Sequence, residues 1–424
     1  MKDVNVPAGY KSTDIGVIPE DWEANKLGDI AVISSGGTPS RNNPSYWNGD
    51  IPWITTTRID FNTIFYSDEF ITQLGLHNSS AKLYDENTLL MAMYGQGKTR
   101  GKIAILGIKA AINQACASIR INQNHHNKYV FYYLLSKYEA IRILSNTGNQ
   151  ENLNGNLIKD INLLVPPLPE QKAIARVLSD VDELIRECDT LLAKKRDIKQ
   201  GTMQQLLTGK QRLPGFSGKW EVHNITKCCQ EIFLGLTAKV DYVKYGGVPL
   251  IRATDISSGK LSFQNALFIS KQQHKQLTKY RKAKYGDVLV SKSGSLGVCA
   301  LVETEKEFSI YESIIVLQPV FKRLNSNFLL CLMTFQETQK SLLSGTVGST
   351  VGHLNLNLFK QLDITLPTIS EQKAIAQILS DMDAEIEALE KKRDKYKAIK
   401  QGMMQELLTG KTRIKPELDH SQGK

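Results

Sequence analysis

The most regular pattern of apolar and polar positions is a seam that occurs twice in the chain. In both stretches the apolar residues are spaced alternately by four and three residues, a 3.5-residue period typical of a coiled coil. The first seam comprises Ile174, Leu178, Val181, Ile185, Cys188 and Leu192, and the second comprises Ile375, Leu379, Met382, Ile386 and Leu389. The spacing predicts two long helices, within 166–213 and 367–412, that pair through these positions. Prolines precede both stretches, and Gly209 and Gly410 follow them as stop signals.

The two predicted helices belong to an internal repeat. Residues 170–210 and 371–411 are identical at 23 of 41 positions, with one constant offset of 201 residues. A helix of about 39 residues is roughly 58 Å long, too long to be buried inside one small domain. We therefore expect the helices to pack on each other, and a pseudo-two-fold relation would make them antiparallel.

Glycines interrupt both predicted helices at equivalent positions, Gly201 and Gly402. A glycine inside a helix costs about 1 kcal/mol relative to alanine. Two interpretations remain open: a kink or frayed point in each helix, or close approach of a partner backbone.

The segments between the helices match each other only weakly and predict two α/β domains, over 1–165 and 214–366. Apolar runs at 88–93, 102–106 and 287–290 indicate strands, whereas 130–144 and 326–343 have helical spacing. Stretches rich in Pro, Asn, Gly and Ser, 36–44 and 345–352, indicate loops. The expected fold class is α+β, two α/β domains separated by two paired helices, with a polar tail at 413–424.

Composition is that of a soluble globular protein, with 41% hydrophobic and 23% charged residues. No apolar run approaches the roughly 18 residues that span a bilayer, and the first residues do not resemble a signal peptide. We expect a cytoplasmic protein without a membrane partner. The six cysteines form no CxxC pair, so free thiols are expected and no metal site is predicted.

The net charge of +10 is concentrated in one predicted domain, because 1–165 is neutral and 214–366 carries +7. Basic and amide side chains crowd one short segment of the second domain and could contact phosphates and base edges of DNA, although a solvated helix face is the alternative. These candidates are Lys271, Gln272, Gln273, Lys275, Lys279, Arg281, Lys282 and Lys284. The first domain has a smaller cluster in a glycine-rich turn, for which a hairpin turn with surface lysines is the alternative. It comprises Gln96, Lys98, Arg100 and Lys102.

No motif in the chain requires catalysis. Residues 92–99 resemble a relaxed phosphate-binding loop, but a strand rather than a helix is predicted to follow, and the second half lacks the motif. The tetrapeptide at 165–168 lacks the leading Asn, Asp or Ser and the trailing aromatic residue of a methyltransferase Pro-Pro motif, and no HExxH is present. We therefore predict no catalytic residues and no directly bound cofactor.

The doubled motif resembles one protein family closely. The Glu-Gln-Lys-Ala-Ile-Ala segment after a proline, the long charged helix and the closing Leu-Leu-Thr-Gly-Lys, all present twice, resemble the specificity subunits of type I restriction–modification enzymes. The resemblance covers essentially the whole chain, in the order recognition domain, central helix, recognition domain, distal helix.

The resemblance implies a non-catalytic subunit that binds double-stranded DNA. Each recognition domain would read one half of a split target, and the antiparallel helices would fix the spacer. Two modification subunits would dock on the helices and methylate adenine with S-adenosylmethionine. Restriction subunits would join through the complex and cleave DNA with ATP and Mg²⁺.

Physical reasoning agrees with this picture. Paired reading modules commonly contact half-sites about one DNA turn apart, ~34–36 Å, which a helix of roughly 58 Å can accommodate. Because the two domains differ in sequence, the target should not be palindromic. The alternatives left open are a stand-alone DNA methyltransferase or nuclease, and a coiled-coil assembly protein without a nucleic-acid role.

Overall fold

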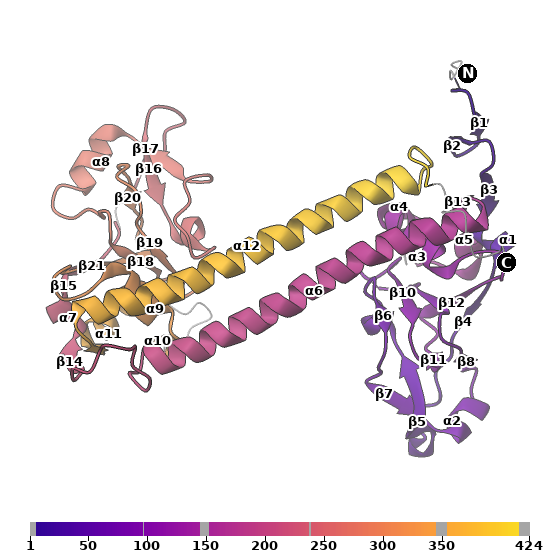
Figure 1. Cartoon of the computed structure of the whole chain (residues 1–424), viewed down its shortest axis with the longest axis horizontal. Helices are drawn as coiled ribbons and strands as arrows, with labels where there is room; N and C mark the ends of the chain where they lie inside the picture. Colours follow the sequence, from indigo (N-terminus) through magenta and orange to yellow (C-terminus); the bar gives the residue numbers. More distant parts are fainter. Residues whose placement is uncertain (1–5, 96, 145–151, 237–238, 345–353, 415–424) are drawn as a thin grey trace, which may run out of the picture. The chain divides into compact units, whose positions relative to one another are not determined.

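A computed structural model describes residues 6–95, 97–144, 152–236, 239–344 and 354–414 of the chain. The chain forms two compact units, and each unit contains parts of both long helices (Figure 1). Unit 1 comprises residues 1–188 and 392–424, and unit 2 comprises residues 189–391. The helices α6 (Leu168–Leu206) and α12 (Ile369–Leu407) therefore each begin in one unit and end in the other.

Unit 1 is built on two main sheets. The five-stranded sheet has the order β4-β12-β9-β10-β6, and the four-stranded sheet has the order β7-β5-β11-β8. The bounds of the five-stranded sheet are β4 Ala31–Ser35, β6 Thr63–Ile64, β9 Leu89–Ala92, β10 Ile103–Leu106 and β12 Cys116–Ile121. Those of the four-stranded sheet are β5 Trp47–Ile54, β7 Glu69–Ile71, β8 Leu83–Tyr84 and β11 Ala110–Ile112.

Short elements complete unit 1. Two small antiparallel ribbons pair β1 with β2 and β3 with β13, and the second ribbon leads directly into α6. The ribbon strands are β1 Tyr10–Thr13, β2 Gly16–Pro19, β3 Glu23–Lys26 and β13 Asn162–Val165. The short helices are α1 Leu27–Ile30, α2 Gln73–His77, α3 Asn127–Ser136, α4 Tyr138–Ile143 and α5 Gly155–Lys159.

Unit 2 repeats this plan with fewer strands. Its sheets have the orders β15-β21-β18-β19 and β17-β16-β20, and the ribbon β14-β22 leads into α12. The strands are β14 Glu221–Asn224, β15 Cys229–Leu234, β16 Val248–Ile251, β17 Leu267–Ile269, β18 Val288–Ser291, β19 Cys299–Leu301, β20 Ser309–Ile310, β21 Ile314–Pro319 and β22 Asp363–Leu366. The short helices are α7 Ile225–Cys228, α8 Lys271–Leu277, α9 Ser326–Thr334, α10 Gln336–Ser344 and α11 Leu356–Gln361.

The central strand β9 of unit 1 is apolar throughout because both of its faces are buried. Successive side chains of a strand point to opposite faces. In β9, Leu89 and Met91 join a cluster with α3 and the long helices, while Leu90 and Ala92 face the second sheet. Strand β18 of unit 2 divides Val288 and Leu289 in the same way.

The long helices pack together inside each unit. In unit 1, Ile174 and Leu178 of α6 share an apolar cluster with Leu407 of α12 and with Leu408. In unit 2, Ile375 and Leu379 of α12 share one with residues 203, 206 and 207. The start of one helix thus lies beside the end of the other, which makes the pair antiparallel, and the predicted fold class is confirmed.

Several sequence-based expectations about local structure can be compared directly. The strands predicted at 88–93, 102–106 and 287–290 are confirmed as β9, β10 and β18, and Gly209 and Gly410 adopt the positive φ of a helix stop. The helix predicted over 130–144 is wrong as one element, since α3 ends at Ser136 and α4 starts at Tyr138. The helix predicted over 326–343 is likewise divided, because Phe335 is extended and buried in the core.

The loop predicted at 345–352 and the tail beyond residue 414 fall outside the described residues. All six cysteines carry free thiols. None of the helices in the described part of the chain has the length and apolarity needed to cross a bilayer.

Candidate nucleic-acid interface

The basic segment predicted in the second domain forms α8 and the strand-free stretch that follows it, 278–284. Ser270 caps α8 by accepting a hydrogen bond from the Gln273 backbone N–H at 3.1 Å. His274 faces inward and lies 2.9 Å from the Ser309 hydroxyl, and burial lowers its pKa. The exposed residues are Lys271, Gln272, Lys275, Lys279, Arg281, Lys282 and Lys284.

Two of the predicted DNA-binding residues already have partners within unit 2. Arg281 lies 3.1 Å from the Glu231 carboxylate, which compensates part of its charge at the surface. The Gln273 amide donates to the Lys239 carbonyl and accepts from the Asp241 N–H, each at 3.2 Å. Gln273 therefore holds a neighbouring segment of chain.

The buried side chains of Asp287 and Gln318 hydrogen-bond to each other and to the backbone of the basic segment. The Asp287 carboxylate accepts a hydrogen bond from the Lys284 N–H at 2.7 Å and one from the Gln318 amide at 2.6 Å. Gln318 also donates to the Lys282 carbonyl at 3.0 Å. Burial raises the pKa of Asp287 to about 6, although both hydrogen bonds oppose the shift. The backbone at 282–284 is thus fixed by Asp287, which directly precedes β18, and by Gln318 of β21.

The smaller cluster of unit 1 lies in the turn between β9 and β10. Gln96 falls outside the described residues, and Lys98 is exposed. Arg100 is buried, and its guanidinium donates to the Arg142 carbonyl at 2.8 and 3.1 Å, so it fastens the turn to α4. Lys102 pairs with Asp60 at 2.6 Å. Contact of this cluster with DNA remains a prediction.

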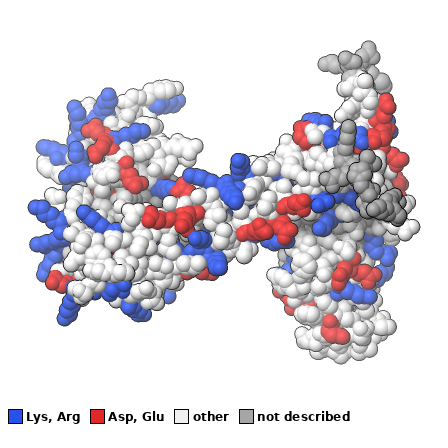
Figure 2. Space-filling model, viewed as in Figure 1, with Lys and Arg blue, Asp and Glu red and all other residues white. Residues whose placement is uncertain are grey.

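The two units therefore present different surfaces. In Figure 2, Lys and Arg side chains crowd the visible face of the unit that carries α8, whereas both signs of charge are interspersed over the other unit. The difference agrees with the charge excess of the 214–366 segment.

The repeated Glu-Gln of the doubled motif is buried and joins three parts of unit 1. Arg413 makes a two-pronged ion pair with Glu170, with both N···O distances 2.7 Å, and also pairs with Asp21 at 2.7 and 2.8 Å. Both carboxylates raise the pKa of Arg413. The Trp22 indole N–H donates to Glu170 at 3.1 Å. We call Glu170, Arg413, Asp21 and Trp22 the unit 1 clasp.

Unit 2 contains an equivalent clasp, formed by Glu371, Arg212 and Trp220. Arg212 pairs with both oxygens of Glu371 at 2.6 Å and donates to the Gly218 carbonyl. The guanidinium lies 5.7 Å from the Trp220 ring, as Arg413 does from Trp22. The Trp220 indole N–H, however, is buried without a hydrogen-bond partner.

The glutamines of the motif tie the start of each long helix to the rest of its unit. Gln171 accepts from the His126 N–H at 2.9 Å and donates to the Pro166 carbonyl at 2.8 Å. Gln372 accepts from the Asn325 N–H at 2.9 Å and donates to the Pro367 carbonyl at 3.0 Å. The repeated motif is therefore a structural joint in both units.

Sequence reasoning missed the arginines of the clasps. Arg212 and Arg413 stand two residues beyond the compared repeat, at the same offset of 201 that relates Glu170 to Glu371. Extending the repeat by two positions would have paired the buried acids with their cations.

Ion pairs between α6 and α12 accompany the apolar contacts. Asp182 pairs with Lys400 at 2.6 Å in unit 1, and the equivalent pair in unit 2 joins Asp383 to Lys199. Unit 2 adds pairs of Glu385 with Lys195 and of Glu390 with Arg196. Among the predicted seam residues, Ile174, Leu178, Ile375, Leu379 and Ile386 are buried, and Val181, Ile185, Met382 and Leu389 are half-buried.

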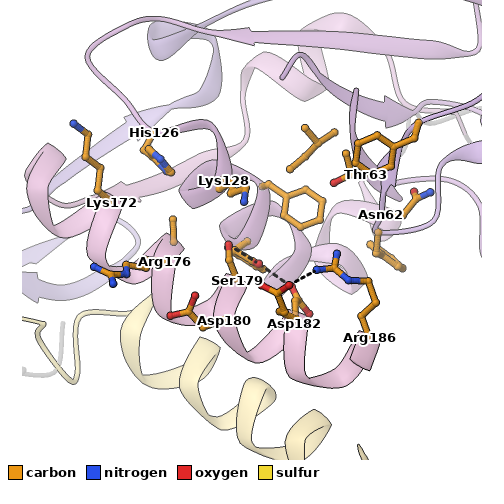
Figure 3. A pocket seen from close by; sticks show the side chains of 17 residues that line it. Asn62, Thr63, His126, Lys128, Lys172, Arg176, Ser179, Asp180, Asp182 and Arg186 are labelled. Atoms are coloured by element: carbon orange, nitrogen blue, oxygen red, sulfur yellow. Dashed lines mark hydrogen bonds and ion pairs between the residues drawn. The ribbon is translucent and has the colours of Figure 1, made fainter. Parts of the chain in front are cut away.

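A groove of about 850 Å³ runs along α6 in unit 1 (Figure 3). Lys172, Arg176 and Arg186 of α6 line it, together with Asn62 and with Thr63 of β6. Tyr132 also lines the groove and donates its hydroxyl to Asp182 at 2.7 Å. The lining is of mixed charge, because Asp180, Asp182 and Glu183 lie among these cations.

Within the described residues, no group of three or more His, Cys, Asp or Glu side chains is arranged to hold a metal ion. The described residues present exposed cations, amides and aromatic rings on a frame fixed by ion pairs to buried glutamates.

The family described as Type I restriction modification DNA specificity domain matches residues 19–194 and 219–398. The chain belongs to this family. It is 24% identical to the type I restriction enzyme MjaVIII specificity subunit of Methanocaldococcus jannaschii, over 94% of each chain. It is 25% identical to the EcoBI specificity subunit of Escherichia coli, over 66% of this chain and 64% of that one.

Solved structures have the same fold. The S subunit of a type I restriction–modification system from M. genitalium superposes with a TM-score of 0.57 at 15% identity, over 91% of this chain and 96% of that one. A chain from a structure titled for complex assembly and conformational transition of the type I R-M system gives 0.56 at 17% identity, over 93% and 99%.

Proposed function

We propose that this specificity subunit reads a bipartite, non-palindromic DNA target, with one half-site read by each unit. The observation that carries the proposal is a shared frame with unlike faces. The clasp glutamates and arginines, the helix ion pairs and the motif glutamines recur at an offset of 201, whereas the surfaces around α2 and α8 differ in charge. Equivalent frames suit two equivalent tasks, and unlike faces suit different base sequences.

The proposal assigns the spacer to the long helices. Each helix is fastened by a clasp at its start and by the apolar cluster at its end. A helix rises about 1.5 Å per residue, so its length can set the distance between two reading surfaces.

Modification subunits would dock on the surface that the helices repeat. The sequence Ile-Lys-Gln-Gly occurs at 198–201 and 399–402, and its isoleucines are 46% and 40% exposed. Two identical apolar positions facing solvent support two copies of one partner. Restriction subunits would join through that complex. The chain itself would be non-catalytic and bind no cofactor, with S-adenosylmethionine, ATP and Mg²⁺ used by its partners in the cytoplasm.

Methylome sequencing of the host with and without the gene tests the reading function. We expect one class of methylated adenines, in a split asymmetric motif, to disappear when the gene is deleted. Loss of a palindromic motif would contradict the two-reader proposal, and an unchanged methylome would contradict a role in modification.

Insertion of one helical turn tests the spacer role separately. Four added residues in α6 and four in α12, at matched positions between the clasps, lengthen each helix by about 6 Å. The methylated motif should keep both half-sites and gain a longer spacer. An unchanged spacer in a stable, DNA-binding variant would show that the helices do not measure the target.

A further inference from the structure

We propose that Tyr245 and Tyr280 contact bases of the half-site read by unit 2, while the cations around them contact phosphates. The inference rests on the proposed function and names residues that would determine specificity. Tyr245 is 91% exposed and Tyr280 is 84% exposed, although tyrosine rings are ordinarily at least partly buried.

The segment that carries Tyr245 is held in place by the sheet. Val243 donates its N–H to the Phe268 carbonyl at 2.9 Å, and Tyr242 forms an antiparallel bridge with Ile269. The segment thus extends the edge of β17. Gln273 adds two hydrogen bonds from α8, to Lys239 and Asp241. The exposed ring therefore projects from an anchored backbone.

Tyr280 projects from the chain that leaves α8. Leu277, Tyr280 and Arg281 line a pocket of about 420 Å³ together with Leu236, which lies just before the segment of Tyr245. The two tyrosines thus belong to segments that border the same helix. Tyr280 lies beside the Lys279 ammonium, 5.1 Å from the ring centroid.

The surroundings of the tyrosines suit a nucleic acid. The exposed cations that flank them are Lys239, Lys244, Lys271, Lys275, Lys279 and Lys282. Lysines neutralise phosphates without reading sequence, whereas an aromatic ring with a hydroxyl can contact base edges and apolar methyl groups. A ring displayed among phosphate-binding cations is therefore placed to read bases.

The same positions in unit 1 have no aromatic ring. Aligning β5 with β16, and α2 with α8, places Asn48 opposite Tyr245 and Ser80 opposite Tyr280. The tyrosines consequently distinguish the two readers, as residues that set different half-sites must. Gln273 is a positioning residue under this proposal, because its amide acts on DNA through the tyrosine segment.

Selection from a pool of random-sequence duplexes tests the proposal, with the full chain co-purified with its modification subunits. The wild type should enrich a bipartite motif. Tyr245→Ala and Tyr280→Ala should each reduce base discrimination by about tenfold or more at positions of one half-site only, a typical cost of a wrong base pair. Lys279→Ala should weaken binding to all sequences alike. Phe321→Ala is the matched control, an aromatic 60% exposed beyond β21, and should leave the motif unchanged.

Each alternative result has a distinct meaning. If the tyrosine variants enrich the wild-type motif with unaltered discrimination, the proposal is overturned while the two-reader function stands. If they lose the modification subunits instead, the tyrosines form a protein interface and the proposal is also overturned. If the wild type itself enriches no motif, the proposed function fails and takes this inference with it.

A double-mutant cycle tests the role of Gln273. Gln273→Ala should reduce discrimination in the same half-site as Tyr245→Ala, and combining the two should add no further loss. Additive losses would mean that Gln273 reads DNA independently of Tyr245, contrary to its positioning role.

Discussion

The two clasps differ in how they satisfy the same buried carboxylate. Glu170 of unit 1 receives Arg413 and the Trp22 indole, and Arg413 is shared with Asp21. Glu371 of unit 2 receives Arg212, and the equivalent Trp220 indole makes no hydrogen bond. Both clasps thus keep the Arg–Glu ion pair, but they differ in the additional hydrogen bonds made by the tryptophan and by Asp21.

This contrast extends outward from the joint to the surface. The helix ends, the clasp ion pairs and the glutamines recur in both units, the central strands agree in pattern, and the exposed faces differ in charge and aromatic content. The sequence difference between the units increases with distance from the helices. The helices are constrained because they pack on each other, whereas the exposed faces are free of that constraint.

The largest expected effect comes from removing the clasp arginines. Arg212→Ala leaves Glu371 charged and buried without its cation, and an uncompensated buried charge is strongly destabilising. Arg413→Ala should cost somewhat less, because Glu170 keeps the Trp22 hydrogen bond. Urea unfolding combined with pulse proteolysis, with fragments assigned to each unit, measures both effects.

The control for this comparison neutralises the orphaned acid. Arg212→Ala with Glu371→Gln should recover a substantial part of the stability that Arg212→Ala loses, since the buried charge is removed. If the double variant is no more stable than Arg212→Ala, the loss of stability comes from the lost packing of Arg212 against Trp220.

The next effect is a pH dependence that Asp287 contributes to unit 2. Burial raises the pKa of Asp287 to about 6 from 3.8, so the folded state binds this proton more tightly than the unfolded state. The resulting contribution of about 3 kcal/mol is present below about pH 4 and is lost as pH rises through 6. Unit 1 has the neutral Thr88 at the equivalent position before its central strand.

Urea midpoints measured for each unit between about pH 4 and about pH 7.5 check this expectation. Unit 2 should lose more stability than unit 1 over that range, and Asp287→Asn should abolish the difference. Equal slopes in both units of the wild type would contradict the assignment of the titration to Asp287.

Much of the frame could be predicted from sequence, because long helices and central strands follow apolar periodicity. Ile174 and Leu178 were predicted as helix-pairing residues and lie where α6 meets the end of α12. The same residues are also part of the domain core. The seam pattern could not predict this, because periodicity shows which helix face is apolar but not which other elements pack against it.

The candidate interface was less predictable because side-chain partners are long-range. Arg100 and Gln273 are residue types that commonly contact DNA. In the structure, however, Arg100 donates to the Arg142 carbonyl and Gln273 donates to the Lys239 carbonyl. Tyr245 lies 26 residues before Lys271 in the sequence, and its segment is brought beside α8 by pairing with β17 and by the hydrogen bonds of Gln273.

The third effect separates the two surfaces by salt dependence. Lys279→Ala with Lys282→Ala should reduce the log–log salt slope of binding to random duplex by about 2, because each phosphate contact contributes about 0.9. Arg281→Ala should reduce it less, since Glu231 already pairs with Arg281. Fluorescence anisotropy between about 50 and about 200 mM salt measures the slopes.

The matched change in unit 1 is Lys82→Ala, at the position equivalent to Lys282. Its slope should equal that of the wild type if unit 1 reads its half-site chiefly with uncharged groups. A reduction as large as that of Lys279→Ala would show that the charge contrast between the units does not extend to their DNA contacts.

The smallest effect concerns Gly201 and Gly402, where the two units agree. Both glycines are exposed inside continuous helices, and a Cβ at either would meet no atom within 4 Å. Alanine at each should therefore stabilise its helix by about 1 kcal/mol, seen as a higher Tm. If the glycines admit a docking partner, the same variants should bind modification subunits more weakly. Asp197→Ala, which gives α6 the residue that α12 has at 398, should leave docking unchanged. Higher stability with undiminished docking would exclude these glycines from the partner interface.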